Sequence, residues 1–291
     1  MIFSRQIMTK KILLTLLLIL FTGNLNAEIK TYKMVFVPAS EKGDESDYKS
    51  LISITEKLTG LSIKTIKVTD YNAAVEAMRA GRAHIAWYGG KTYVKAAEIA
   101  NAEAFAAGVR PGEKDAGYYT YFVANKNSNL KKFEDVKGKV LSLNSIGSTS
   151  GDLIPQVELN KINLSIKNKE HFKNVFYAGS HDACLLAVLN NQAEVCAMSS
   201  RNFEARIEDG TIKLEDVRII HKSDKVPPPP LAYSKLIPLD DRIKIKNAVL
   251  DSHNHGEIGG YGGKMSHYIE VKDLDYNVLR DVIKLLNKDK S

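Results

Sequence analysis

Residues 140–152 read Val-Leu-Ser-Leu-Asn-Ser-Ile-Gly-Ser-Thr-Ser-Gly-Asp. The first four are typical of a buried β-strand, the next form a turn rich in glycine and hydroxyl groups, and a helical pattern begins after Gly151. Strand, turn and helix in this order are the unit of a mostly parallel sheet covered by helices. Because such units follow one another along the chain, the expected fold class is α/β.

The same alternation is found on both sides of this stretch. Strands are expected at residues 33–38, 62–68, 85–88, 174–177, 194–198 and 218–221, and helices at 48–58, 71–79 and 183–191. Two extended segments, residues 121–125 and 222–230, are expected to cross between two lobes. Four prolines favour an extended form of the segment 222–230. The expected domains are a discontinuous first lobe of residues 28–122 plus 226–291 and a second lobe of residues 123–225.

The first 27 residues have the order of a secretory signal peptide. Arg5, Lys10 and Lys11 precede an apolar run at residues 12–21, and polar residues lead to Ala27. The run is too short for a membrane-spanning helix, which needs about 20 apolar residues. We expect cleavage near Ala27 and a periplasmic protein.

The charge of the remaining chain is mildly positive. Residues 1–27 hold three basic residues and no acid, so their removal lowers the formal charge from +7 to +4. This charge helps to attract an anion. It is too diffuse for a nucleic-acid-binding protein, which clusters Lys and Arg on one face.

Cys184 and Cys196 are the only cysteines. In an exported chain they could form a disulfide, or both could be small buried hydrophobic side chains on a helix and the following strand. The second interpretation is favoured, because a spacing of twelve positions does not show that the two Cα atoms come within bonding range.

The turn at residues 147–151 has the chemistry of an anion site. A helix start presents unpaired N–H groups and a positive dipole end, and the hydroxyls of Ser148, Thr149 and Ser150 add donors. Flanking glycines let the backbone approach an anion closely. The alternative is an ordinary helix cap, for which one hydroxyl suffices.

A second strand-to-helix turn contains His181, which could donate to an oxyanion from the cleft or be structural. Asp182 is expected to cap the following helix, although Ser180 could also do so. Tyr71, Tyr118 and the segment 87–89 could form the wall of the cleft or pack in the core.

These segments together resemble the periplasmic phosphonate-, phosphite- and phosphate-binding proteins of ABC transporters. The matching residues keep the family's order and spacing from about residue 34 to 250; they lie at 36–38, 70–71, 76–81, 85–89, 93–94, 147–151 with Pro155, 179–183 and 186–188. The resemblance implies a two-lobed type II periplasmic-binding-protein fold with two crossover strands and a central ligand cleft.

The resemblance also implies a function. The protein is expected to capture phosphate, phosphite or a simple phosphonate by lobe closure and to deliver it to a membrane permease. It is expected to be a monomer and to need no cofactor, metal or nucleic acid. The family's ligand-binding positions correspond to six residues of this chain: Ser148, Thr149, Ser150, His181, Tyr118 and Tyr71.

The chain departs from the family at two places. Relatives carry an acidic residue where this chain has the prolines at 227–230, and polar or acidic residues where it has Ser199 and Ser200. In binders of aminophosphonates, carboxylates from these regions pair with the ligand's ammonium group. Their absence here indicates a ligand without an amino group and leaves open a different oxyanion.

Other functions fit the sequence less well. A hydrolase would use Ser148 or Ser150 with His181 and Asp182. The nucleophile motif G-x-S-x-G requires serine at its centre, whereas this chain has Thr149 there, so no enzyme is expected. A ligand sensor for a receptor or sensor kinase would share the fold. Residues 251–257 contain metal-ligand types, but we interpret this segment, which precedes the glycine-rich residues 259–263, as a mobile polar surface segment.

Overall fold

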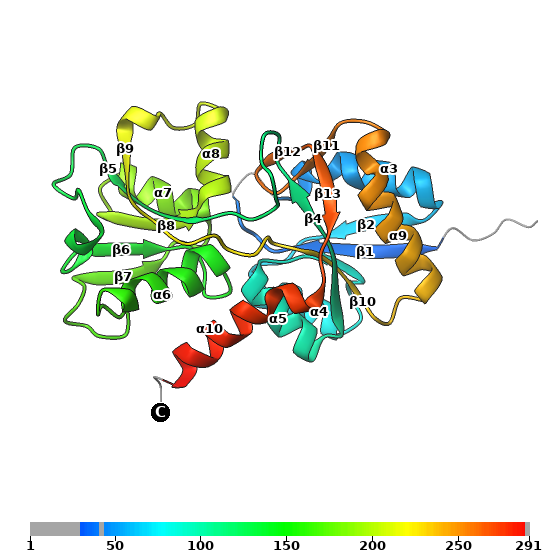
Figure 1. Cartoon of the computed structure of the whole chain (residues 1–291), viewed down its shortest axis with the longest axis horizontal. Coiled ribbons are helices and arrows are strands. Elements are labelled where there is room, and N and C mark those ends of the chain that lie inside the picture. Colours follow the sequence, from blue (N-terminus) through cyan, green and yellow to red (C-terminus); the bar gives the residue numbers. More distant parts are fainter. Residues whose placement is uncertain (1–29, 41–43, 289–291) are drawn as a thin grey trace, which may run out of the picture. The chain divides into compact units, whose positions relative to one another are not determined.

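The computed structural model describes residues 30–40 and 44–288. The signal peptide expected at residues 1–27 lies outside them. Within the described residues, α-helices and β-strands alternate and build two large sheets and one hairpin (Figure 1). No helix in this part of the chain is long and apolar enough to cross a membrane.

The first sheet has six strands in the order β13-β4-β10-β3-β1-β2. β1, β2 and β3 are parallel, whereas β10 and β13 pair antiparallel with their neighbours. The bounds of its strands are β1 Thr31–Phe36, β2 Ser62–Ile66, β3 Ile85–Trp87, β4 Ala102–Val109, β10 Leu231–Ser234 and β13 His267–Glu270. Its helices are α2 Asp44–Asp47, α3 Lys49–Thr59, α4 Tyr71–Arg79, α5 Gly90–Ile99, α9 Leu239–Asp251 and α10 Asn277–Lys288.

The second sheet has five strands in the order β7-β6-β8-β5-β9. Its strands are β5 Thr120–Asn125, β6 Val140–Leu143, β7 Asn174–Tyr177, β8 Val195–Ser199 and β9 Val217–Lys222, and its helices are α6 Ile154–Lys161, α7 His181–Leu189 and α8 Ser200–Glu208. Successive residues of β5 point to opposite faces. Phe122 packs with Leu159 of α6, and Val123 packs with Leu185 of α7, so helices cover both faces of the sheet.

The chain passes twice between the two sheets, as the sequence suggests. The passing segments meet at an antiparallel bridge in which Val226 N–H donates to Tyr118 O at 2.7 Å and Tyr118 N–H donates to Val226 O at 3.2 Å. Residues 121–125, expected to cross, instead belong to β5 and pair with β8 and β9. The crossing of the first segment therefore lies before Thr120.

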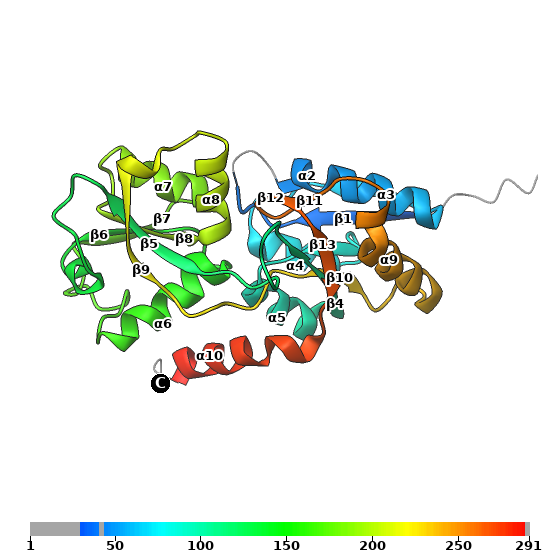
Figure 2. The ribbon, with the colours of Figure 1, turned by 45° about the horizontal axis from the view of Figure 1, so that its top comes forward.

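Several elements were not foreseen. β4 is rich in alanine and pairs with β10 and β13. The hairpin of β11 Ile258–Gly260 and β12 Gly263–Met265 follows the histidine-rich segment, where no strand was expected. Helix α10 packs beside α5, where its Leu279 is buried close to Gly90 (Figure 2).

Cys184 and Cys196 form a disulfide, with their Cα atoms 5.5 Å apart. The interpretation of both as unlinked hydrophobic side chains was wrong. The helix α7 lies directly on β8, and this packing brings the two sulfur atoms together. The bond fixes the helix that begins with His181 to the strand that ends with Ser199.

Candidate functional site

We call the six-stranded sheet with its helices the first lobe and the five-stranded sheet with its helices the second lobe. A small cavity lies where residues of the two lobes meet. Its volume of about 10 Å³, counted as room for the centre of a water-sized sphere, is about what one water molecule needs. All six side chains proposed from the sequence line it, together with four further residues: Tyr71, Trp87, Gly89, Tyr118, Ser148, Thr149, Ser150, His181, Pro229 and Tyr261. We call this space the cavity.

Ser148 starts the hydroxyl turn. Its Oγ accepts a hydrogen bond of 3.0 Å from Gly151 N–H, and a π-helical turn at Thr149–Leu153 follows. Such π-helical turns are often found at functional sites. The turn leads into α6, so the three hydroxyls stand at a helix start that follows β6, as the sequence predicts.

The glycines on each side of the turn are required by close packing. A Cβ on Gly147 would lie 2.3 Å from Tyr71 Cβ, and one on Gly151 would lie 2.3 Å from Asn144 Cβ and 3.1 Å from His181 Cε1. Asn144 in turn donates through Nδ2 to Tyr71 Oη at 3.3 Å. The small residues therefore let the turn, Tyr71 and His181 approach one another.

Thr149 connects the two lobes. Its Oγ1 accepts a 2.9 Å hydrogen bond from Lys91 N–H, at the start of α5. Burial raises the pKa of Tyr118, and hydrogen bonds with the Ser150 and Thr149 hydroxyls oppose the rise. Tyr118 is therefore a neutral phenol that stands within a cluster of hydroxyl groups.

His181 is neutral and oriented. It is 1% exposed, and burial lowers its pKa to about 3. Its Nδ1 accepts from Ser199 N–H at 3.3 Å, so in the neutral ring Nε2 carries the proton and is a donor. The backbone N–H of His181 donates to Ala39 O of the first lobe at 3.1 Å.

Asp182 has a different role from the one expected. Ser180, not Asp182, caps α7, because its Oγ accepts from Ala183 N–H at 3.0 Å. The buried carboxylate of Asp182 instead pairs with Arg206, with Oδ1 and Nε 3.3 Å apart. An acid that faces an arginine of α8 does not orient His181, as a catalytic triad requires.

Four helix starts converge on the cavity. α4 begins at Tyr71, α5 is capped by Gly89, the π-helical turn begins at Thr149 and α7 begins at His181. Each helix start carries a partial positive charge of about half a unit, and several of its first N–H groups are paired within the protein, such as Lys91 N–H with Thr149 Oγ1 and Ala183 N–H with Ser180 Oγ. Among the described residues, no acidic or basic side chain lines the cavity apart from the neutral His181, so its walls present backbone and neutral side-chain dipoles.

Tyr261 is a cavity residue that the sequence did not reveal. It is 4% exposed and stands at the tip of the β11–β12 hairpin. Its signal was an aromatic residue between two pairs of glycines. Trp87 and Gly89 had been suggested only as parts of a wall, and Pro229 is the third of the four prolines.

Residues of the first lobe hold the hydroxyl turn from outside the cavity. Lys91 Nζ donates to the carboxylate of Asp152 and to Ile146 O, and Thr92 Oγ1 donates to Gly147 O at 2.7 Å. Asp152 has a side chain that is only 2% exposed. These contacts form only when the two lobes are together.

A buried cation lies close to the cavity. Arg201 is 3% exposed and donates to the carbonyl oxygens of Ala116 at 2.6 Å and Gly108 at 3.2 Å. No carboxylate pairs with it in residues 30–40 and 44–288. Its Cβ lies 3.1 Å from where a Cβ on Gly262 would stand, beside Tyr261. Because arginine stays charged in proteins, it adds positive potential there.

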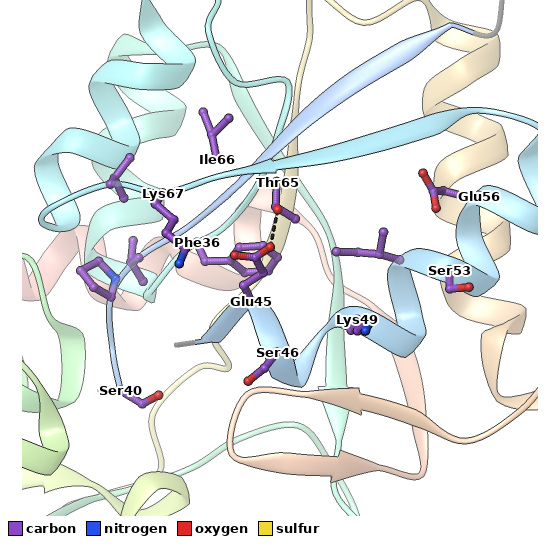
Figure 3. Close-up of a pocket in the computed structure, with 14 residues that line it drawn as sticks. Phe36, Ser40, Glu45, Ser46, Lys49, Ser53, Glu56, Thr65, Ile66 and Lys67 are labelled. Atoms are coloured by element: carbon purple, nitrogen blue, oxygen red, sulfur yellow. Dashed lines mark hydrogen bonds between the residues drawn. The ribbon is translucent and has the colours of Figure 1, made fainter. Parts of the chain in front are cut away.

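A larger hollow lies elsewhere, between α3 and β2 (Figure 3). Its volume is about 760 Å³. Its polar groups do not converge on one point: Thr65 donates to Glu45, and Glu56 accepts from Ile63 N–H at 2.7 Å. The small cavity, where polar groups of several elements meet, is therefore the candidate site.

The histidine-rich segment pairs within itself. His255 Nε2 lies 2.7 Å from Asp251 Oδ2, one turn earlier in the chain. In the part of the chain that the structure describes, no three His, Cys, Asp or Glu side chains form a group that could hold a metal ion.

Comparisons with known proteins agree with this geometry. The sequence profile of a family described as "ABC transporter, phosphonate, periplasmic substrate-binding protein" matches residues 34–276. The chain is 28% identical over 211 residues to the phosphonates-binding periplasmic protein of Escherichia coli, covering 71% of this chain and 61% of that protein. It is 27% identical over 205 residues to the phosphate-import protein PhnD of Mycolicibacterium smegmatis, covering 68% and 64%. The chain thus spans less than two thirds of the length of these relatives.

Two solved structures share the fold. A binding protein component of an ABC phosphonate transporter from Pseudomonas aeruginosa has a TM-score of 0.74 at 22% identity, over 88% of this chain and 86% of that chain. PhnD1 from Prochlorococcus marinus, in complex with methylphosphonate, has a TM-score of 0.74 at 22% identity, over 89% and 99%. The expected type II periplasmic-binding-protein fold is confirmed.

Proposed function

Because this chain belongs to the phosphonate periplasmic substrate-binding family of ABC transporters, we propose that it is the solute-binding component of an importer and captures a small phosphorus oxyanion. The ligand class is phosphate, phosphite or a simple phosphonate. The proposal rests chiefly on the four helix starts that converge on a buried cavity lined by hydroxyl groups.

The proposed binding uses neutral donors. Ser148, Thr149 and Ser150 donate to the ligand oxygens from the second lobe, and His181 donates through Nε2. Tyr71 adds a hydroxyl from the first lobe, and Tyr118 adds one from the passing segment. Neutral dipoles in a dry site stabilise an anion strongly because they are already oriented.

Lobe closure follows from the placement of these groups. The cavity has walls from both lobes, so a ligand gains all its hydrogen bonds only in the closed form. A ligand that binds one of two conformations more tightly shifts the population toward that form. The permease is then proposed to recognise the closed form.

The small volume of the cavity favours compact ligands. Room of about 10 Å³ is about that of one water molecule, so the surrounding side chains must move slightly even for a compact tetrahedral ion and much further for a long alkyl chain. Relatives of this chain are named for phosphonates, phosphate and phosphite. Each of these three ions offers oxygen atoms to the same donors.

The order of basic, apolar and polar residues at 1–27 supports export to the periplasm, where a monomer is proposed to deliver its ligand.

A permease partner would be shown by ligand-dependent stimulation of ATPase activity when the protein is added to its transporter in vesicles. A protein that acts only as a ligand sensor would bind the same anion but would not stimulate the ATPase activity of the transporter.

Isothermal titration calorimetry against phosphate, phosphite, methylphosphonate and sulfate tests the ligand class. We expect saturable heat with at least one phosphorus oxyanion and a matching rise in melting temperature. The absence of both with every phosphorus oxyanion would refute the proposed function, and a preference for sulfate would change the ligand class.

A further inference from the structure

Trp87 has a buried polar atom whose partner is missing from the described protein. The residue ends β3 and is 2% exposed. Its indole Nε1–H is fully buried and has no acceptor among residues 30–40 and 44–288. The same side chain lines the cavity, so the unpaired donor belongs to a residue at the site.

The surrounding rings hold the indole in place. The ring of Tyr261, itself a cavity residue, lies 4.6 Å from that of Trp87, and the ring of Tyr48 lies 5.9 Å away. A tryptophan packed between aromatic rings has little freedom to turn its N–H toward another acceptor. The cost of a buried donor without an acceptor therefore persists in the free closed form.

An indole N–H differs chemically from the hydroxyl groups of the cavity. A serine, threonine or tyrosine hydroxyl can donate or accept, whereas an indole N–H can only donate. A phenylalanine would fill much of the same space without a buried polar atom. The presence of tryptophan is thus explained by an acceptor that arrives with the ligand.

We propose that Trp87 is a ligand-binding residue whose Nε1–H donates to one oxygen of the bound oxyanion. The inference rests on the proposed function and adds a contact from the first lobe. Because the donor is fixed, the ligand must place an oxygen at this position. A methyl group or a hydrogen on phosphorus must therefore point elsewhere, and the indole orients the ligand within the cavity.

The chain contains one tryptophan, which makes a direct test possible. In ¹⁵N-labelled protein the indole gives a single cross-peak in a proton–nitrogen correlation spectrum. Phosphate, phosphite and methylphosphonate are titrated in parallel with calorimetry. We expect the indole proton to shift downfield for each ion that binds, and the shift to follow the calorimetric saturation curve.

A pair of variants measures the contribution of the donor. Trp87→Phe keeps an aromatic ring and removes the N–H, so affinity should fall about 10- to 100-fold, as for the loss of one hydrogen bond to a charged oxygen. Tyr233→Phe is the control, because Tyr233 is a buried aromatic residue on the neighbouring β10 that does not line the cavity. Its affinity should equal that of the wild-type protein.

The outcomes separate the two proposals. Binding heat with an unmoved indole peak, or with unchanged affinity in folded Trp87→Phe, would overturn the role of Trp87 and leave the proposed function standing. Absence of heat and of any shift with all three ions would overturn both. The spectrum of the wild-type protein decides the question even if Trp87→Phe does not fold.

Discussion

Thr149 has two hydrogen-bonding roles in the site. Its oxygen accepts from Lys91 N–H, which leaves its hydroxyl hydrogen for Tyr118 or for a ligand. Thr149→Val keeps the shape and removes both. We expect affinity for the preferred oxyanion to fall about 10- to 100-fold, because a hydrogen bond to a charged group contributes roughly 1.5–3 kcal/mol.

Calorimetry and urea unfolding of one preparation measure the two consequences of Thr149→Val. The matched control is Thr55→Val, since Thr55 is a buried threonine of α3 whose hydroxyl donates to Leu51 O. It should lose stability without losing affinity. Unchanged affinity in Thr149→Val, with a stability loss like that of Thr55→Val, would show that Thr149 is only structural.

His181 makes the stability of the free protein depend on pH. Its pKa is lowered from 6.5 to about 3 by burial, so below pH 6.5 the unfolded chain binds a proton that the folded chain does not. The free energy of unfolding from this residue should therefore fall as pH falls from about 6.5 toward 3. The slope approaches about 1.4 kcal/mol per pH unit.

Urea unfolding at pH 7 and pH 5 tests this dependence. His181→Gln should have a smaller difference between the two pH values than the wild-type protein, by about 2 kcal/mol. Equal differences would mean that His181 is accessible to protons in the fold. His181 itself should contribute little to any change of ligand affinity over this range, because the ring stays neutral.

At the scale of elements, Lys91 of α5 is the main link to the hydroxyl turn. It bonds Asp152 and Ile146 O, while Asp152 also accepts from Tyr177 Oη at 2.7 Å. Lys91→Met should keep both lobes folded and weaken the closed form alone. We expect affinity to fall about tenfold, which is ~1.4 kcal/mol of binding free energy. The factor should be the same for phosphate, phosphite and methylphosphonate.

The equal factor distinguishes this link from a direct ligand contact. Stopped-flow measurements should assign most of the loss in Lys91→Met to faster release. Lys161→Met is the control, since Lys161 pairs with Glu158 and Asp224 away from the cavity, and it should bind normally. A loss that differs strongly among phosphate, phosphite and methylphosphonate would contradict the expectation.

The disulfide joins α7 to β8. Replacing both cysteines by alanine should lower the free energy of unfolding by about 2–4 kcal/mol, because the unfolded chain gains freedom. The wild-type protein treated with reductant should show the same loss in urea unfolding. Affinity should change little if packing alone keeps His181 next to Ser199. Equal stability of the variant and the oxidised wild-type protein would contradict this.

Local patterns predicted the elements whose residues carry their own signals. The range 71–79 matches α4, whose N-cap Asp70 accepts from Asn72 and Ala73 N–H. The range 174–177 matches β7. β4 reads Ala-Glu-Ala-Phe-Ala-Ala-Gly-Val, a composition that favours a helix, and it is a strand because β10 and β13 pair with it.

The site divides in the same way. The Ser148–Ser150 turn could be proposed because hydroxyls at a helix start have recognisable chemistry, whereas His181 was proposed chiefly from the family resemblance. Tyr261 reaches the cavity from a hairpin more than a hundred residues away from the turn, and only the folded chain brings it there. The cap of α7 was assigned wrongly because Ser180 and Asp182 are both good caps, and Arg206, which decides between them, lies on another helix.

At the scale of the whole molecule, charge placement restricts the ligand. No carboxylate from residues 30–40 or 44–288 lines the cavity, Asp182 is paired with Arg206, and Glu204 is paired with Arg110 at 2.9 Å. The guanidinium of Arg201 adds positive potential nearby. An ammonium group buried here would have no partner, which is costly.

2-Aminoethylphosphonate should therefore bind no more tightly than ethylphosphonate. Competition calorimetry with the two ligands, which differ by the amino group, measures the preference directly. A clear preference for the aminated ligand would mean that Glu204 or Asp182 leaves its arginine. In that case Glu204→Gln or Asp182→Asn would abolish the preference.

The bond between Cys184 and Cys196 also sets an order of events for an exported chain. Thiols stay reduced in the cytosol and become oxidised in the periplasm. On the proposed export route, the chain before transport lacks the cross-link that holds α7 against β8, and the second lobe is easier to unfold. A translocation channel that accepts only unfolded chains would therefore transport the reduced chain more easily than the oxidised one. Oxidation on the far side would then complete the fold where the ligand is found.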